Sequence, residues 1–492
     1  MQRYDLYIDG QFSKPAGDEY FESFDPYAGK PWALVAKGGG DDVRRAVESA
    51  HRAFQGAAWR GITATARGHL LRRLGDLVAA NAEGLARVET RDNGKLLAEM
   101  LGQVRYIPQW FYYYGGLADK IEGSVIPIDK PKMFTYTQHE PLGVVAAITP
   151  WNSPLLLATW KLAPALAAGN TIVWKPSEFA SASALEFVKL VEQAGFPTGV
   201  VNVVTGLGAD VGEPLVTHPL VAKVAFTGGE QAGQRVYELA ARGLKRVTLE
   251  LGGKSPNIVF DDANLENAMK GVISGIFAAT GQTCIAGSRL LVQRSIHDQL
   301  VDKLVNFAKT ARIGDPSDLN TQVGPVTTRP QYEKVLRYIE EAKREGATCL
   351  LGGGPSRRPE CGDGWFVEPT IFSSVTPEMK VAREEVFGPV LAVLPFEDEE
   401  DAIRIANSLP YGLAAGVWTE NIGRALAMAK RLEAGTVWVN TYRAVSYMAP
   451  FGGYKRSGLG RENGMDTIKE YLQTKSVWID MGNEVPNPFV MR

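Results

Sequence analysis

The residues best equipped for chemistry in this chain are one thiol and one carboxylate. Cys284 lies among small and polar neighbours in the segment GQTCIAGSR (281–289), and Glu250 precedes a glycine pair in LELGGK (249–254). Most lone cysteines are small apolar fillers and most glutamates are surface charges, but the flanking glycines and the lack of an aliphatic run favour a functional role. A thiol nucleophile and a carboxylate that activates water are the minimum needed to form and hydrolyse a thioester. No histidine lies near either residue in sequence, so a Cys–His protease arrangement has no local support.

Asn152 is a third candidate, preceded by Pro150 and Trp151 and followed closely by Pro154. A primary amide can donate a hydrogen bond to a developing oxyanion without competing for a proton. An asparagine that caps the helix expected near Pro154 explains the same pattern. Position alone leaves both interpretations open.

Three turns could contact a dinucleotide. The segment FTGGE (226–230) ends an expected strand and begins an expected helix, whose N-terminal amides favour an anion, although an ordinary glycine turn explains it equally well. The segment GLGADVG (206–212) spaces its glycines one residue wider than the dinucleotide fingerprint and is weak evidence alone. In KPSE (175–178), Lys175 could approach a ribose or phosphate, and Glu178 could accept from a ribose diol and repel a 2′-phosphate. That repulsion favours NAD over NADP, whereas a solvated surface loop is the simpler explanation of the segment by itself.

These turns belong to a repeating order of strands and helices. Apolar, β-rich runs predict strands at 144–149, 171–175, 200–205, 222–227, 246–251 and 255–260, and helices are expected near 154–168, 181–194, 210–216 and 231–242. Continuous apolar strands separated by helices imply a parallel sheet covered on both faces. Ligands of such sheets bind at the carboxyl ends of the strands, which is where the turns described above and residues 150–152 fall.

The remaining chain is expected to build three further parts. Residues up to about 120 read as mostly helical, and a second α/β region from about 255 to 448 contains Cys284. Residues 122–140 include β-leaning segments, and 471–479 read as a strand. A projecting hairpin with a stranded tail is expected to serve oligomerisation, because unpaired strands seek partners.

Composition excludes several classes of protein. A length of 492 residues allows two or three domains, and a formal net charge of −2 gives no electrostatic case for nucleic acid or an anionic membrane. There is no run of about 20 apolar residues and no apolar signal-peptide core, so we expect no membrane span. Five scattered histidines show no zinc-site spacing, so we expect no metal.

The cysteine count points to a reducing compartment. Three cysteines in a chain of this length do not make a disulfide framework, which favours the cytoplasm. Cys349 lies in an apolar run and is expected to be buried and inert. Cys361 precedes Gly-Asp-Gly and is expected in an exposed loop.

Taken together, these segments resemble the NAD(P)-dependent aldehyde dehydrogenase superfamily of the hydrolytic, non-acylating type. The segments around Glu250 and Cys284 look like its two signatures, and five further motifs follow the expected order: PWN (150–152), WKPSE (174–178), FTGG (226–229), EEVFGP (384–389) and PFGGYK (450–455). The resemblance covers nearly the whole chain. Several ordered matches are far more specific than any one of them, so the alternative explanations of the single segments lose most of their weight.

The resemblance implies roles for particular residues. Cys284 would be the nucleophile, Glu250 the general base, and Asn152 an oxyanion-hole donor beside the backbone N–H of Cys284. The cofactor would contact Ile148, Thr149, Pro150, Trp151, Lys175, Ser177, Glu178, Gly208, Phe226, Gly228, Gly229, Leu251, Glu385 and Phe387. The substrate would contact Ser153, Leu157, Trp160, Thr283, Ile285, Arg443, Val445 and Phe451.

Departures from the family pattern concern both ligands. The family commonly has serine at the position of Gly229, so one hydroxyl contact to the pyrophosphate is expected to be lost. Ser153 stands where an aromatic residue is common, which should widen the substrate tunnel. Arg443 could meet a carboxylate on the substrate, or it could be a rim arginine that points to solvent.

The predicted fold is α/β with three parts. A Rossmann-like parallel-sheet cofactor domain would comprise residues 1–121 and 141–252, and a second α/β catalytic domain residues 253–449. A small β oligomerisation element would comprise 122–140 and 468–492. The resemblance also implies a homodimer or homotetramer.

The predicted activity is oxidation of an aldehyde to the carboxylic acid with NAD, through a Cys284 thioester that Glu250-activated water hydrolyses. A water-attack step needs a base, so Glu250 favours hydrolysis over transfer to coenzyme A. Two alternatives remain: a catalytically silent binding or structural relative, and a CoA-acylating or esterase activity of the same thiol.

Overall fold

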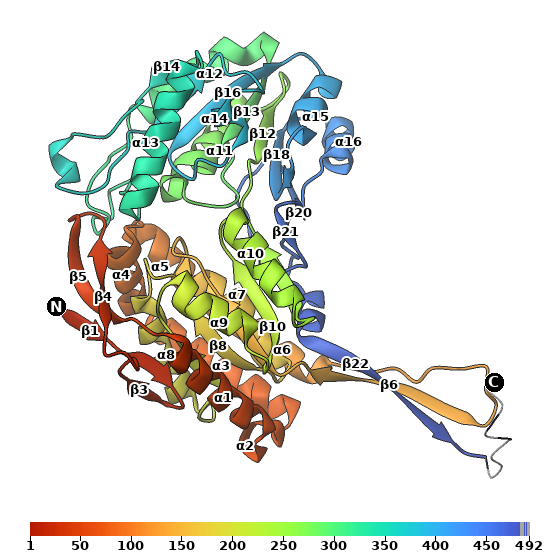
Figure 1. Ribbon diagram of the computed structural model, residues 1–492. Coiled ribbons are helices and arrows are strands. Elements are labelled where there is room, and N and C mark those ends of the chain that lie inside the picture. Colours follow the sequence, from red (N-terminus) through yellow and green to blue (C-terminus); the bar gives the residue numbers. More distant parts are fainter. Residues whose placement is uncertain (483–486, 488, 490–492) are drawn as a thin grey trace.

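The computed structural model describes residues 1–482, 487 and 489, which form two α/β lobes and a projecting two-stranded arm (Figure 1). The lobe drawn in red to yellow contains an eight-stranded sheet, and the lobe drawn in green to blue contains a seven-stranded sheet. The α/β class with Rossmann-like parallel sheets and a small strand element, predicted from sequence, is confirmed.

The eight-stranded sheet has a parallel centre. Its strand order is β21-β11-β10-β7-β8-β9-β2-β3, and the pairs from β11 to β9 are parallel. The strands are β2 (Leu6–Ile8), β3 (Gln11–Ser13), β7 (Val144–Ile148), β8 (Thr171–Lys175), β9 (Val201–Val203), β10 (Val221–Thr227), β11 (Arg246–Glu250) and β21 (Gly458–Leu459). The connecting elements are α7 (Pro154–Ala167), α8 (Ala182–Ala194), a π-helical turn (Gly208–Gly212), α9 (Glu213–Thr217) and α10 (Glu230–Ala241). Every predicted strand and helix of this region forms, with ends shifted by a few residues.

The seven-stranded sheet contains the sixth predicted strand. Its order is β14-β15-β16-β13-β12-β18-β19, and only the β14–β15 pair is antiparallel. The strands are β12 (Pro256–Val259), β13 (Arg289–Gln293), β14 (Thr348–Leu351), β15 (Thr370–Ser373), β16 (Val390–Phe396), β18 (Ala414–Trp418) and β19 (Thr436–Val439). The helices are α11 (Leu265–Phe277), α12 (His297–Ala308), α13 (Arg329–Arg344), α14 (Lys380–Arg383), α15 (Glu399–Asn407) and α16 (Ile422–Arg431), and β17 (Tyr411–Gly412) pairs with β20 (Tyr454–Lys455).

The first 36 residues correct the prediction of a mostly helical start. They form β2, β3 and a separate three-stranded sheet of β1 (Gln2–Tyr4), β4 (Tyr20–Asp25) and β5 (Lys30–Ala36). These strands are short and find their partners far away, as in the pairing of Tyr7 with Val203, so local periodicity does not reveal them. The predicted helices follow: α1 (Gly40–Gln55), α2 (Ala57–Arg60), α3 (Ala64–Ala80), α4 (Ala82–Asn93), α5 (Leu97–Tyr106) and α6 (Pro108–Leu117).

The arm consists of β6 (Met133–Pro141) paired antiparallel with β22 (Leu472–Asp480), and it extends away from both lobes (Figure 1). Val125 adds an isolated bridge to Tyr136. Trp478 is 57% exposed on this arm and Ile479 45%. Residues 483–486, 488 and 490–492 of the predicted element 468–492 lie outside the described residues.

Two of the three cysteines lie opposite to expectation. Cys349 is exposed, because its strand β14 is the edge of the sheet, and Cys361 is buried with Phe366 and Val323 in a small apolar cluster. All three thiols are free. In the described part of the chain, no helix meets the length and apolarity needed to cross a membrane, and no group of three or more His, Cys, Asp or Glu is placed to hold a metal.

Candidate active site

Two adjoining cavities lie at the carboxyl ends of the parallel strands of the eight-stranded sheet. The outer one, called here the trough, has a volume of about 320 Å³, and the inner one, called the Cys284 cavity, about 180 Å³. Pro150, Trp151, Thr227, Gly228 and Gly229 line both, so the two are continuous. A ligand in the trough can therefore reach the thiol.

Asn152 and Cys284 line the same cavity, although they are 132 positions apart in the sequence. Asn152 precedes α7, is buried, and donates from Nδ2 to the backbone oxygen of Gln282 at 3.0 Å. This bond fixes the amide and leaves its second N–H free. Burial raises the pKa of the Cys284 thiol to about 12, while the backbone amides of Cys284 and Ile285 lower it.

The backbone just before Cys284 is strained. Ala279 and Thr280 adopt left-handed φ angles of 54° and 55°, which non-glycine residues rarely adopt. Gly281 follows at φ 69°, and a Cβ there would fall 2.1 Å from the oxygen of Gly388. Such conformations persist only where the surroundings enforce them, and they concentrate at functional sites. Tight packing against Gly388 thus fixes the turn that presents the thiol.

Glu250 ends β11 and is the most unusual carboxylate of the site. It is buried, it lines the Cys284 cavity, and neither of its oxygens has a hydrogen-bond partner among the described residues. Burial and the nearby charge of Glu462 raise the pKa of Glu250 well above its usual value, while Lys161 and Arg461 act in the opposite direction. A raised pKa and two free oxygens suit a group that exchanges protons with water.

A buried ion pair lies behind Glu250. Lys161, on α7, contacts Glu462 and donates to Thr227 Oγ1 at 2.6 Å, and both charged side chains are fully buried. Because Lys161 and Glu462 affect the pKa of Glu250 with opposite signs, this pair adjusts the proton affinity of the carboxylate, although neither residue lines the cavity itself.

The outer end of the trough carries the predicted lysine and glutamate. Lys175 ends β8, is buried, and donates to Glu178 Oε2 at 3.3 Å and to the oxygen of Pro176 at 3.1 Å. Burial lowers the pKa of Lys175, and Glu178 raises it. The side chain of Glu178 is 28% exposed, so its oxygens remain accessible to a ligand. The pair thus offers one cation and one acceptor side by side.

The middle of the trough is shaped by glycine. Gly229 is the N-cap of α10, has no side-chain cap, and has no atom within 4 Å of a Cβ built on it. At Gly228 such a Cβ would fall 2.6 Å from Phe226 Cζ. The uncapped amides of a 12-residue helix therefore face the trough across a surface that lacks side chains, which is a cradle for an anion.

The inner end of the cavity is held together by a second loop. Glu385 accepts from the backbone N–H of Gly253 at 3.1 Å, and Phe387 packs edge-on against Trp151 with ring centroids 5.3 Å apart. Gln331 donates to the oxygens of Val386 and Phe387 at 2.8 and 3.0 Å. Residue 387 has a left-handed φ of 58°, so this loop too is constrained.

All fourteen residues expected to contact the cofactor line one of the two cavities. Leu251, Glu385 and Phe387 line the Cys284 cavity, and the other eleven line the trough. Sequence reasoning missed Gln331 and Lys334 on α13, and it missed the far wall of the trough, where Arg235 pairs with Glu213 at 2.9 Å. Helical spacing of Gln331 and Lys334 was visible in the sequence, but nothing local indicated that α13 packs beside residue 387.

The residues expected to contact the substrate are more scattered. Leu157 lines the Cys284 cavity, and Trp160, one turn further along α7, packs edge-on against Phe451 at 5.1 Å. Ser153, Trp160, Ile285 and Phe451 are buried, and Thr283 and Val445 are partly exposed. Arg443 is also partly exposed. Its guanidinium donates a hydrogen bond to the backbone oxygen of Ser274 at 3.0 Å.

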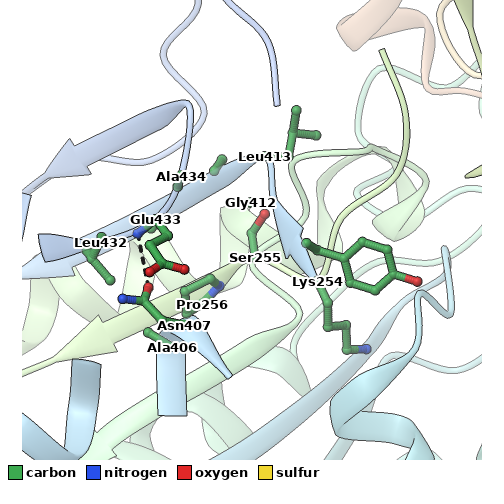
Figure 2. Close-up of a pocket in the computed structure, with 13 residues that line it drawn as sticks. Lys254, Ser255, Pro256, Ala406, Asn407, Gly412, Leu413, Leu432, Glu433 and Ala434 are labelled. Carbon is green, nitrogen blue, oxygen red and sulfur yellow. Dashed lines mark hydrogen bonds between the residues drawn. The ribbon is translucent and has the colours of Figure 1, made fainter. Parts of the chain in front are cut away.

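A separate small cavity lies under the turn that follows Glu250 (Figure 2). Figure 2 shows Glu433 and Asn407 on one side, joined by a 3.0 Å hydrogen bond from the Glu433 amide, and Lys254 on the other. Its volume of about 10 Å³ holds one water molecule at most. It is too small for a substrate, and neither Cys284 nor Glu250 lines it, whereas both line the Cys284 cavity. The trough and the Cys284 cavity are therefore the candidate active site.

Comparison with known proteins agrees with this geometry. Residues 12–477 match the family described as "Aldehyde dehydrogenase family". The chain belongs to the aldehyde dehydrogenase family. It is 47% identical, over the full length of both chains, to (Z)-2-((N-methylformamido)methylene)-5-hydroxybutyrolactone dehydrogenase of Acinetobacter baylyi.

Two solved family members share the whole fold. Betaine aldehyde dehydrogenase of Staphylococcus aureus, solved in complex with NAD+, is 40% identical with a TM-score of 0.97, and 99% of this chain and 97% of that chain are covered. An aldehyde dehydrogenase of Bacillus cereus, solved as an NAD+ complex, is 43% identical with a TM-score of 0.95, covering 98% and 97%.

Proposed function

We propose that this protein oxidises an aldehyde to the carboxylic acid with NAD, using Cys284 as nucleophile, Glu250 as general base and Asn152 as oxyanion donor. The observation that carries the proposal is the continuity of the trough with the Cys284 cavity, where all three residues meet. Family membership and the NAD+ complexes of two relatives support it.

The trough fits a dinucleotide in shape and in charge. Lys175 and Glu178 would hold the adenosine ribose, the amides at the start of α10 would hold the pyrophosphate, and Glu385 would hold the nicotinamide ribose beside Phe387. The carboxylate of Glu178 would repel a 2′-phosphate, so NAD is favoured over NADP. When bound, NAD supplies the acceptor for the hydride that leaves the substrate carbon.

The first half of the reaction acylates the thiol. Cys284, as thiolate, attacks the aldehyde carbon and the carbonyl oxygen becomes an oxyanion. The Asn152 side chain and the Cys284 backbone N–H stabilise that oxyanion, and one such donor contributes about 10²–10³ in rate. Loss of hydride from the carbon then restores the carbonyl and leaves a thioester on Cys284.

The second half releases the acid. Glu250 takes a proton from water, and the resulting hydroxide attacks the thioester carbon. The tetrahedral intermediate collapses with cleavage of the C–S bond, which returns Cys284 as thiolate and gives the carboxylic acid. The two unpartnered oxygens of Glu250 leave it free to bind that water.

The molecule is proposed to be organised as the sequence suggested. Residues 1–121 and 141–252 would form the cofactor domain, 253–449 the catalytic domain, and 122–140 with 468–492 the oligomerisation element. The apolar side chains exposed on the arm support a homodimer or homotetramer. Three free thiols support a cytoplasmic location.

The test is to incubate the protein with NAD and simple aldehydes and to follow NADH absorbance. Cys284→Ala should abolish NADH formation and the acyl-enzyme, which mass spectrometry detects. Glu250→Gln should still form some thioester but should not turn over. Full steady-state turnover of the Gln variant would overturn the assignment of Glu250 as the base. If the wild type formed no NADH, the interpretation as a catalytically silent binding protein would be favoured instead. Product formation that requires coenzyme A, or that proceeds without NAD, would instead identify acyl transfer or esterase activity.

A further inference from the structure

Buried hydrogen-bond donors around the thiol lack acceptors. Lys95 is 2% exposed and donates to Ser153 Oγ at 3.0 Å. An ammonium has three N–H groups, and Ser153 is the only acceptor it has among the described residues. Burial lowers the pKa of Lys95 to about 8, so it is mostly charged at neutral pH. Two donors of a buried cation thus remain available.

The indole of Trp160 presents the same situation. Trp160 is 3% exposed, stacked near Trp110 and edge-on to Phe451, and its Nε1 has no acceptor in the described structure. An indole N–H can only donate. The Thr283 hydroxyl, next to the nucleophile, is also buried without a partner. Leaving such donors unpaired in the interior is costly, so they point to a ligand that supplies acceptors.

These donors lie close along the chain, or through Ser153, to residues that line the Cys284 cavity. Ser153 directly follows Asn152, which lines the Cys284 cavity, and Trp160 lies one turn beyond Leu157, which lines it too. Lys95 is near enough to Cys284 for a thiolate there to raise the pKa of the lysine. Lys95, Trp160 and Thr283 line neither the trough nor the Cys284 cavity, so they lie behind the residues that form the cavity wall.

The acidic groups that raise the pKa of Lys95 form no hydrogen bond with it among the described residues. Glu99 and Arg443 act on the pKa of Lys95 with opposite signs, and Glu89 adds a smaller acidic effect. Glu99 accepts from the Ala279 amide at 2.7 Å, and Glu89 accepts from the Leu155 amide at 2.9 Å. Both carboxylates hold backbone amides, although Glu99 Oε2 is buried without a partner in the described structure. Neither carboxylate accepts from Lys95, so its spare donors remain for a ligand.

We propose that Lys95, with Ser153 and Trp160, forms a subsite for an oxygen acceptor on the tail of the aldehyde, either a carboxylate or a carbonyl. Lys95 is then a specificity-determining residue for the reaction proposed above, on which this inference rests. An aldehyde with such a tail satisfies the buried donors, whereas an alkyl aldehyde leaves them unpaired.

The experiment compares kcat/KM of the holoenzyme for three aldehydes of similar length: pentanal, 4-oxobutanoate and 4-oxobutanamide. The wild type should favour at least one acceptor-bearing substrate over pentanal by tenfold or more, and the preferred one identifies a carboxylate or a carbonyl. Lys95→Met, which keeps the stem and removes the donors, should reduce that preference at least tenfold. Lys430→Met, on the exposed face of α16, is the matched control and should keep it.

A second variant and a binding measurement keep the test valid if Lys95→Met fails to fold. Trp160→Phe removes the indole N–H, keeps an aromatic ring, and should also reduce the preference. Titrations with succinate and with pentanoate, followed by tryptophan fluorescence, report binding of the tail without chemistry. Succinate should bind more tightly than pentanoate to the wild type, and this difference should be lost in the Lys95→Met variant. Equal kcat/KM for all three aldehydes, or a preference unchanged in both variants, would overturn the subsite. Oxidation of none of them would instead count against the proposed function.

Discussion

The two glycines at the start of α10 give a prediction with an internal control. Replacing Gly228 with alanine places a Cβ 2.6 Å from Phe226 Cζ and 3.0 Å from Cε1, whereas a Cβ on Gly229 meets nothing within 4 Å. Neither glycine has a left-handed φ angle, so alanine is not excluded by the backbone at either position. The two substitutions add the same methyl group one residue apart and differ only in what it touches.

The size of the effect follows from the contact. The nearest approach is about 0.9 Å shorter than an ordinary carbon–carbon contact of about 3.5 Å. Phe226 is packed in the apolar core of the sheet and also lines the trough, so the ring can yield only toward the trough. Overpacking of this kind costs about 1–3 kcal/mol, and a ligand that must push the ring back loses that amount. The Kd for NAD of Gly228→Ala should therefore rise about 5- to 150-fold.

The assay is calorimetric titration of NAD into the wild type and both variants, with thermal unfolding measured in parallel. Gly229→Ala should bind NAD within about threefold of the wild type, since its backbone amide is unchanged. The reasoning is refuted if Gly228→Ala binds NAD as tightly as the wild type, or if Gly229→Ala is the weaker binder. A loss of Tm in Gly228→Ala without loss of affinity would show that the ring yields into the core instead.

Four further predictions follow from charges and exposed surface. Because the pKa of Cys284 is raised to about 12, alkylation of the cofactor-free protein by iodoacetamide should quicken about tenfold per pH unit between pH 7 and 9; a plateau near pH 8 would contradict the burial argument. Glu462 raises the pKa of Glu250, so Glu462→Gln should lower it and move the rising limb of the kcat–pH profile to lower pH, and a shift to higher pH would reverse the assigned sign. Glu178→Gln removes the carboxylate that opposes a 2′-phosphate and should raise the NADP-to-NAD ratio of kcat/KM at least tenfold; an unchanged ratio would place cofactor choice elsewhere. Trp478→Asp charges an exposed apolar position on the arm and should lower the mass measured by light scattering, while a wild-type mass would remove this position from any interface.

The sequence determined the elements that carry the site. Strands such as 171–175 are short apolar runs that end in a polar or glycine turn, and this pattern is local. The carboxyl ends of parallel strands meet at one edge of a sheet, so the turns at 150–152, 175–178 and 228–229 could be placed together without coordinates. Cys284 and Glu250 stood out for a similar reason, since their glycine-rich neighbourhoods are unusual for a filler cysteine or a surface glutamate.

The tertiary structure decided the contacts between distant segments. Lys161 meets Glu462 across 301 positions, and Lys95 meets Ser153 across 58, and neither pairing has any local signal. Burial also came from packing alone, as the reversed positions of Cys349 and Cys361 show. Side-chain type and spacing report the backbone conformation of a few neighbouring residues, but the pKa of Glu250 and the free donors of Lys95 depend on which groups exclude water from them. Only the folded chain brings those groups together.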